Sequence, residues 1–191
     1  WCQNLPLPWI LLGKGSNVLA NDEGFHGVVI CPEGDFLAIH TEGYQIHAGC
    51  GVSLARVARE ALDHELTGME FASGIPGSLG GAVYMNAGAY GGEMSQVLSS
   101  IQYLDQTGIH TIGPDEARFD YRNSRFMQEG SLVLGAVLHL KPGDRQQIQD
   151  QMQELARRRK EKQPLEYPSA GSMFKRPEGY FAGKLIQDAA L

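Results

Sequence analysis

The segment Phe119–Phe126 contains side chains that could bind an anion. Two arginines, a tyrosine and a serine lie between its aromatic ends, directly before a strongly apolar stretch. An arginine that is partly desolvated by such neighbours can hold a carboxylate with its planar fork of N–H donors. Taken alone, the segment fits an ordinary surface ion pair slightly better, and such pairs contribute little.

A short loop near the start of the chain could hold a phosphate oxygen. It follows an apolar run and consists of Gly13, Lys14, Gly15, Ser16 and Asn17. It is not a dinucleotide fingerprint, because Val18 stands at the sixth position, and it lacks the Gly-Lys-Ser/Thr ending of a P-loop. Its amides and polar side chains suit an anion, although an ordinary turn explains the loop equally well.

A second glycine-rich segment, Gly74–Glu93, is interrupted by bulky residues such as Ile75, Leu79 and Val83. Glycines spread through a buried segment allow the backbone to approach a flat or charged ligand closely. Together the two glycine segments could hold the ends of a diphosphate-linked cofactor. A tightly packed turn region that binds nothing is the alternative.

Other kinds of chemistry have less support in the sequence. Ser172 follows a glycine at the start of a short apolar run, where serine is usually a turn residue. The six histidines have no metal-binding spacing, so we expect no metal site, and no Gly-x-Ser-x-Gly elbow exists for a hydrolase.

The charge of the chain argues against nucleic acid or an anionic membrane as a partner. The net charge is −6, and the one basic cluster, Arg157–Lys160, lies where cations suit the end of a predicted helix. No apolar run is long enough to insert into a membrane. Three cysteines without a paired spacing favour a reducing, cytoplasmic setting. We expect a monomer, and a chain cut from a longer protein because it lacks an initiating Met.

Hydrophobic periodicity and turn residues predict mixed helices and strands without regular alternation, which indicates an α+β fold. Strands are expected at 9–12, 28–30, 36–40, 44–48, 101–105, 108–112, 132–141 and 172–175. A helix capped by Ser53 is expected to end near Gly68, and others to span 144–162 and to begin near Ala182.

Six motifs, in this order, resemble those of one family. They are Gly13–Asn17, Gly74–Ala82, Asn86–Glu93, Tyr121–Ser124, Arg159–Pro164 and Ala170–Lys175. The chain is similar, from about Leu11 to Leu191, to the UDP-N-acetylenolpyruvoylglucosamine reductases, and it looks like the shorter of their two subtypes.

This resemblance implies a two-subdomain FAD-binding fold of the vanillyl-alcohol oxidase type, followed by the start of an α+β substrate-binding domain. The expected division is the end of the first FAD-binding subdomain (1–31), the second subdomain (32–142), and a linking helix with the beginning of the substrate domain (143–191). FAD would be non-covalent, because the first loop offers no histidine. The implied FAD-binding residues are Gly13, Lys14, Gly15, Ser16, Asn17, Gly74, Ile75, Pro76, Gly77, Ser78, Gly80, Gly81, Ala82, Asn86, Ala87, Gly88 and Tyr90.

The resemblance also implies NADPH as reductant and a sugar-nucleotide substrate, the enolpyruvyl ether of UDP-N-acetylglucosamine, in peptidoglycan precursor synthesis. It assigns Arg122 to stabilising the enolate and Ser172 to donating a proton, while Tyr121, Lys162 and Lys175 would bind substrate. A third catalytic group, a glutamate near the family's C-terminus, lies outside this chain. The first loop departs from the commoner Gly-Gly-Gly at Lys14, and Arg176 stands where many relatives have asparagine.

Two other functions remain open at this point. One is another FAD-dependent oxidoreductase of the same fold group, such as a sugar or alcohol oxidase. The other is a non-catalytic remnant that binds flavin or a nucleotide.

Overall fold

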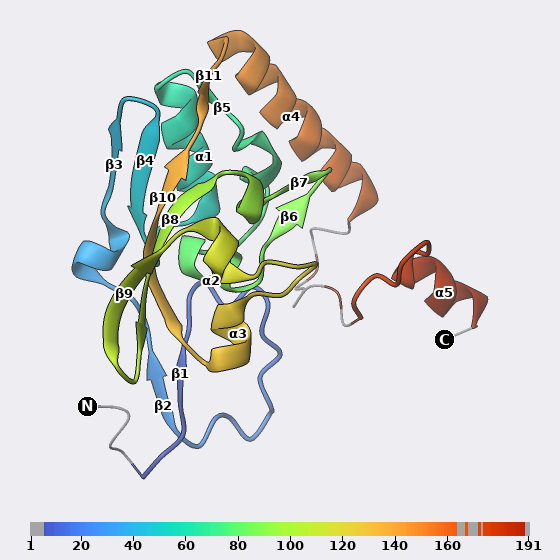
Figure 1. Ribbon diagram of the computed structural model, residues 1–191. Coiled ribbons are helices and arrows are strands. Elements are labelled where there is room, and N and C mark those ends of the chain that lie inside the picture. The colour runs from blue at the N-terminus through green and yellow to red at the C-terminus, as the bar shows by residue number, and fades with distance from the viewer. Residues whose placement is uncertain (1–5, 164–166, 168–171, 173, 190–191) are drawn as a thin grey trace.

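A five-stranded antiparallel sheet is the centre of the molecule (Figure 1). The computed structural model describes residues 6–163, 167, 172 and 174–189. The sheet order is β3-β4-β10-β8-β9, with β3 at Ile39–Glu42, β4 at Gln45–Gly49, β8 at Leu98–Asp105, β9 at Gly108–Ile112 and β10 at Leu132–His139. Gly43 and Gly108 turn the two outer hairpins with positive φ angles of 56° and 134°, which glycine adopts without steric cost.

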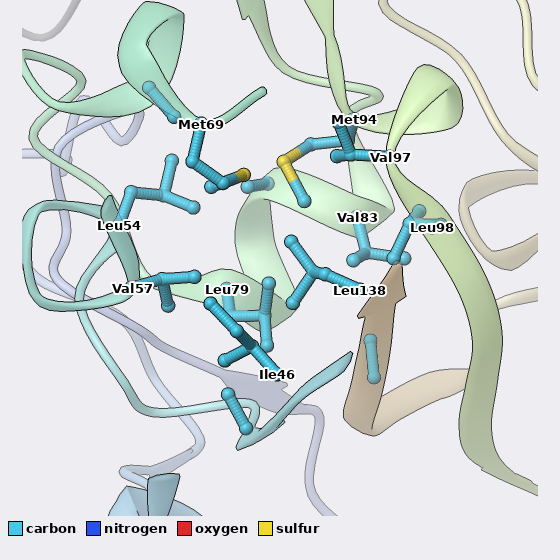
Figure 2. Close-up of a cluster of buried hydrophobic side chains, with 14 of the residues drawn as sticks. Ile46, Leu54, Val57, Met69, Leu79, Val83, Met94, Val97, Leu98 and Leu138 are labelled. Carbon is cyan, nitrogen blue, oxygen red and sulfur yellow. The ribbon is translucent and has the colours of Figure 1, made fainter. Parts of the chain in front are cut away.

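Two helices pack on one face of this sheet and form the core with it. Helix α1 (Leu54–Asp63) begins at Ser53, whose Oγ accepts a hydrogen bond from the Arg56 amide at 3.3 Å. Helix α2 (Leu79–Tyr84) begins at Ser78. Figure 2 shows Leu54, Val57 and Leu79 facing Ile46 and Leu138 of the sheet, and all five side chains are fully buried.

A separate parallel pair of strands leads into the first glycine loop. Strand β1 (Trp9–Leu11) pairs with β2 (Val28–Ile30), and the Leu12 amide donates to the Ile30 carbonyl at 2.8 Å. The chain between these strands contains Gly13–Asn17, so the loop lies directly at the end of β1.

Short elements complete the body, and a long helix runs along it. The short strands are β5 (Leu66–Thr67), β6 (Gly88–Ala89), β7 (Gly92–Glu93) and β11 (Lys141–Pro142); the short helices are η2 (Gly34–Leu37), η3 (Glu70–Ala72), η4 (Met94–Gln96), η5 (Pro114–Ala117) and α3 (Arg125–Glu129). Helix α4 (Arg145–Lys162), capped by Asp144, packs against α1 and η3, and α5 (Ala182–Asp188) follows (Figure 1). Among the described residues, no helix is both long and apolar enough to cross a membrane.

The structure corrects three of the expected elements. Phe36 and Leu37 lie in η2 instead of a strand, after Gly34 with φ of 58°. Helix α1 ends at Asp63 because Glu65 has φ of 57° and Leu66 then starts β5, which pairs with β11. Of the strand expected at 172–175, the described residues 172, 174 and 175 are not in a strand, and the rest lies outside the described part.

Candidate functional site

The two glycine segments touch each other. A Cβ added to Gly13 would lie 2.1 Å from Ser78 Oγ, and one added to Gly77 would lie 3.8 Å from Ser16 Oγ. The first distance is far shorter than a real Cβ contact, so a side chain at residue 13 would force either the loops apart or the Ser78 hydroxyl to rotate. The two segments expected to hold one cofactor therefore lie next to each other in the fold.

The second segment is fixed from behind by the backbone that precedes α1. The Leu79 amide donates to the Val52 carbonyl and the Gly80 amide to the Cys50 carbonyl, both at 2.8 Å. A Cβ on Gly80 would lie 2.7 Å from Cys50 Cβ, so this glycine is required by packing. Burial raises the pKa of the Cys50 thiol, which therefore stays protonated and serves as a packing group.

The first loop presents an exposed polar surface beside this contact. Gly13, Lys14, Gly15 and Asn17 are exposed, and Ser16 is half-buried against Gly77. Gly15 has φ of 68° with nothing within 4 Å of an added Cβ, so the backbone there is open to a ligand. A loop of open amides with a lysine and two polar side chains fits the diphosphate of a dinucleotide.

The predicted FAD-binding residues of the second segment differ in how exposed they are. Gly74, Pro76, Gly81 and Tyr90 are exposed, and Ile75, Gly77, Ala87 and Gly88 are half-buried; Ser78, Gly80, Ala82 and Asn86 lie in the interior. The exposed and half-buried residues could reach a ligand directly. The interior ones shape the wall from within.

A two-residue hairpin tip presents Tyr121 and Arg122. Asp120 and Asn123 exchange both backbone hydrogen bonds, each at 3.1 Å, and Arg122 has φ of 53°. The left-handed region is uncommon for a residue with a side chain, and such conformations concentrate at functional sites. The Arg122 guanidinium carbon lies 4.9 Å from the centre of the half-exposed Tyr121 ring.

The same arginine reaches the second glycine segment. Its Nη1 donates to the Asn86 carbonyl at 3.2 Å and its Nη2 to the Gly88 carbonyl at 2.6 Å. A guanidinium has five N–H groups, so these two bonds orient it while leaving donors for a bound anion. Below the hairpin, the Oγ of fully buried Ser124 donates to the Tyr84 carbonyl at 2.7 Å and anchors the segment to α2.

The remaining predicted residues are not joined to Arg122. Lys162, Ser172 and Lys175 are exposed, and within the described part of the chain no hydrogen bond or ion pair connects them to Arg122 or to either glycine segment. In the same part, no three metal-binding side chains come together. A hollow of about 880 Å³ lies elsewhere, among Trp9, residues 104–107 and residues 129–132, and includes none of the predicted site residues.

Sequence reasoning missed the role of Arg159. In the basic cluster at the end of α4, Arg157 and Arg158 pair with Glu154, whereas Arg159 Nη1 donates to the Gly74 carbonyl. A Cβ on Gly74 would lie 3.5 Å from Arg159 Cδ. The signal was present in the periodicity, because position 159 continues the inward stripe of Ile148, Met152 and Leu155.

Comparison with known proteins agrees with this arrangement. Residues 1–113 match the family model described as an FAD binding domain, and residues 163–191 match the C-terminal domain of UDP-N-acetylenolpyruvoylglucosamine reductase. The crystal structure of that reductase from Thermus caldophilus superposes with a TM-score of 0.85 at 36% identity, covering 97% of this chain and 68% of the other. The chain belongs to the UDP-N-acetylenolpyruvoylglucosamine reductase family.

Curated members of this family are closer in sequence. The reductase of Clostridium novyi (strain NT) is 51% identical over 191 residues, which is 100% of this chain, and that of Streptococcus thermophilus (strain CNRZ 1066) is 50% identical over 97% of it. The chain spans 62% and 61% of those two proteins. A Cu,Mo-CO dehydrogenase chain matches at 14% identity with a TM-score of 0.52, which shows likeness of fold alone. The expected family and its α+β FAD-binding fold are thus confirmed.

Proposed function

We propose that this member of the family is an FAD-dependent reductase that uses NADPH to convert the enolpyruvyl ether of UDP-N-acetylglucosamine into UDP-N-acetylmuramate for peptidoglycan precursor synthesis. The observation that carries the proposal is the contact of Arg122 with Asn86 and Gly88. It joins an anion-binding side chain to a glycine wall that itself meets the Gly13–Asn17 loop. The cysteines described, Cys31 and Cys50, are free thiols, which supports a cytoplasmic enzyme.

The residues present fit non-covalent FAD. The exposed amides of Gly13–Asn17, with Lys14, would hold the diphosphate, and Gly74–Gly81 would form the wall beside it. When bound, this cofactor supplies two-electron transfer from NADPH to the vinyl group of the substrate. The protein's part is to hold the cofactor and substrate in register and to exclude water.

Arg122 would bind the substrate carboxylate. Reduction at the vinyl terminus builds negative charge on the carbon beside that carboxylate, and the charge can spread into it as an enolate. A guanidinium already oriented by the Asn86 and Gly88 carbonyls stabilises this charge without having to reorganise. Tyr121, stacked beside the guanidinium, would line the same binding surface.

Ser172 would then donate the proton that the enolate carbon needs. A hydroxyl is a weak acid in water, but an enolate is basic enough to accept from one that is well positioned. Exposed Lys162 and Lys175 would bind the substrate's phosphates or its carboxylate. This assignment requires the Ser172 hydroxyl to lie beside the substrate held by Arg122, and the glutamate outside this chain to complete the site.

We also propose the division into three units, at 1–31, 32–142 and 143–191. The parallel β1–β2 pair lies in the first, the whole five-stranded sheet in the second, and α4 begins the third.

The test is spectroscopic and uses the intact gene product. We expect a yellow protein whose flavin absorbance is bleached by NADPH without oxygen and restored by the enolpyruvyl sugar nucleotide. A colourless protein that cannot be reconstituted with FAD would indicate a remnant. A flavin that sugars or alcohols reduce, and that ignores NADPH, would indicate an oxidase.

A further inference from the structure

Asn86 is a fully buried polar residue in a strained conformation. Its side chain is 1% exposed, and its φ of 42° lies in the left-handed region. Both side-chain polar atoms are used: Oδ1 accepts from the Ser95 amide at 3.0 Å, and Nδ2 donates to the Asp120 carbonyl at 3.1 Å. The side chain is therefore committed to the protein itself.

Asn86 holds the Arg122 hairpin at two places. Its side chain binds the carbonyl of Asp120, the first residue of the hairpin, and its own carbonyl accepts from Arg122 at the tip. Through Oδ1 it is tied to Ser95 in η4, next to the well-packed Met94. One residue thus connects the base and tip of the hairpin to the rigid core.

A buried side-chain amide stabilises a protein core less than an apolar side chain of the same size does. An unpaired one costs stability, and a paired one gains little over an apolar side chain of similar shape. What a satisfied buried amide does provide is a single arrangement of its partners. Asparagine also tolerates the left-handed backbone that aims its carbonyl at Arg122.

We propose that Asn86 is a positioning residue that fixes the Arg122 guanidinium where the substrate carboxylate binds. The inference rests on the proposed function, because it concerns Arg122 in that reaction. It gives Asn86 a role other than the direct FAD contact implied by the resemblance.

The first test is Asn86→Asp in the intact gene product. Aspartate keeps the size, the left-handed backbone and the acceptor for Ser95, but places an oxygen against the Asp120 carbonyl where a donor stood. We expect reoxidation of the reduced flavin by the sugar nucleotide to slow about 10- to 100-fold, because a small displacement of a positioning contact costs this much. Flavin reduction by NADPH should keep its rate. Equal slowing of both steps would overturn the proposal.

A double-mutant cycle separates positioning from general damage. If Asn86 acts through Arg122, then Asn86→Asp should change the rate of reoxidation less than about twofold once Arg122 is lysine. Fully multiplicative effects would contradict the inference. Val57→Ala is the matched control, since Val57 is 0% exposed in α1 and belongs to the hydrophobic core, and its side chain carries no polar atom. It should lower the melting temperature and leave both half-reactions unchanged.

The last test needs no activity and can use flavin-free protein. Backbone amide exchange at Asp120 and Asn123, which bond each other across the hairpin, should quicken in Asn86→Asp, while the Ser95 amide keeps its protection. Unchanged exchange at the hairpin would disprove the structural link itself. If wild-type protein never turns over the sugar nucleotide, the proposed function fails, and this exchange result still decides whether Asn86 orders the hairpin.

Discussion

Gly13 lies at the contact between the two glycine segments, where only a hydrogen atom separates its Cα from the Ser78 side chain. In Gly13→Ala the new methyl group would sit 2.1 Å from Ser78 Oγ. Either the loops separate, or Ser78 rotates and stops accepting from the Gly81 amide at the start of α2. Overpacking of this kind costs about 1–3 kcal/mol, so we expect FAD to bind roughly tenfold more weakly.

Flavin fluorescence titration measures this effect. Gly113→Ala is the control, because an added Cβ there meets nothing within 4 Å and the φ is −80°. It should bind FAD like wild type. Wild-type affinity in Gly13→Ala would mean that the two loops do not meet as described.

Residue types alone drew attention to the two glycine segments and to the arginines of 119–126, because their chemistry can be read directly from the sequence, whereas the choice of Arg122 came from the family resemblance. They did not predict that Asn86 is buried, since an asparagine among glycines suits an exposed loop as well as an interior one. The burial of Asn86 depends on its hydrogen bond to the Asp120 carbonyl, which lies 34 positions away in the sequence and is brought close only by the fold.

At the scale of elements, α4 is the link between the C-terminal part of the chain and the glycine wall. Arg159 on its inward face binds the Gly74 carbonyl at the start of the wall. Arg159→Met removes a charged hydrogen bond worth roughly 1.5–3 kcal/mol and leaves the Gly74 carbonyl without this donor. We expect about tenfold weaker FAD binding, measured by the same titration.

Arg158→Met provides the comparison for this substitution. Arg158 is one position away on α4, and among the described residues its one ion-pair partner is Glu154, at an exposed site. A surface pair of this type contributes little, so FAD affinity should not change. Equal losses in both variants would point to damage to the helix and not to the Gly74 contact.

The β8–β9 turn should carry a measurable acid dependence. The hydroxyl and then the amide of Thr107, followed by His110, lower the pKa of Asp105 from 3.8 to about 2. Because the folded pKa is depressed, the ionised carboxylate stabilises the fold above pH 4, and this is lost as the pH falls towards 2. In Asp105→Asn the melting temperature should be lower than that of wild type at pH 6.

Urea or thermal unfolding, measured at several pH values between 6 and 2, gives the difference in stability between wild type and Asp105→Asn. It should shrink as the pH falls from about 4 to about 2, because the Asp105 carboxylate takes up a proton over this range and so comes to resemble the neutral asparagine. A difference that stays constant across this range would mean that the charge of Asp105 plays no part.

Periodic elements were predicted well and α2 was not. The start and buried stripe of α1, the β8–β9 hairpin and α4 follow their expected patterns closely, since amphipathic stripes and turn residues are local signals. The end of α1 does not, because the positive φ of Glu65 stops the helix before Gly68. Helix α2 contains Gly80 and Gly81, which disfavour helix. It forms because Ser78 caps it and Leu79 and Val83 are buried against the sheet, and this tertiary effect leaves no local trace.

At the scale of the whole molecule, a ligand between the two glycine segments would bridge the β1–β2 pair and the part of the chain that carries α2. The β1–β2 pair has its hydrogen bonds within itself and meets the sheet domain where Gly13 touches Ser78. FAD bound across this junction binds only the folded arrangement, so it must raise stability by mass action. The gain is about 2.7 kcal/mol when free FAD is about a hundredfold above its Kd.

We therefore expect the melting temperature of the flavin-free protein to rise with FAD concentration, and tryptic cleavage at Lys14 to slow in parallel. The exposed loop that carries Lys14 is the part of the junction that a diphosphate would cover. Riboflavin, which lacks the diphosphate, is the control ligand and should protect Lys14 far less. If FAD raised the melting temperature but left cleavage at Lys14 unchanged, the diphosphate would have to bind away from the first loop.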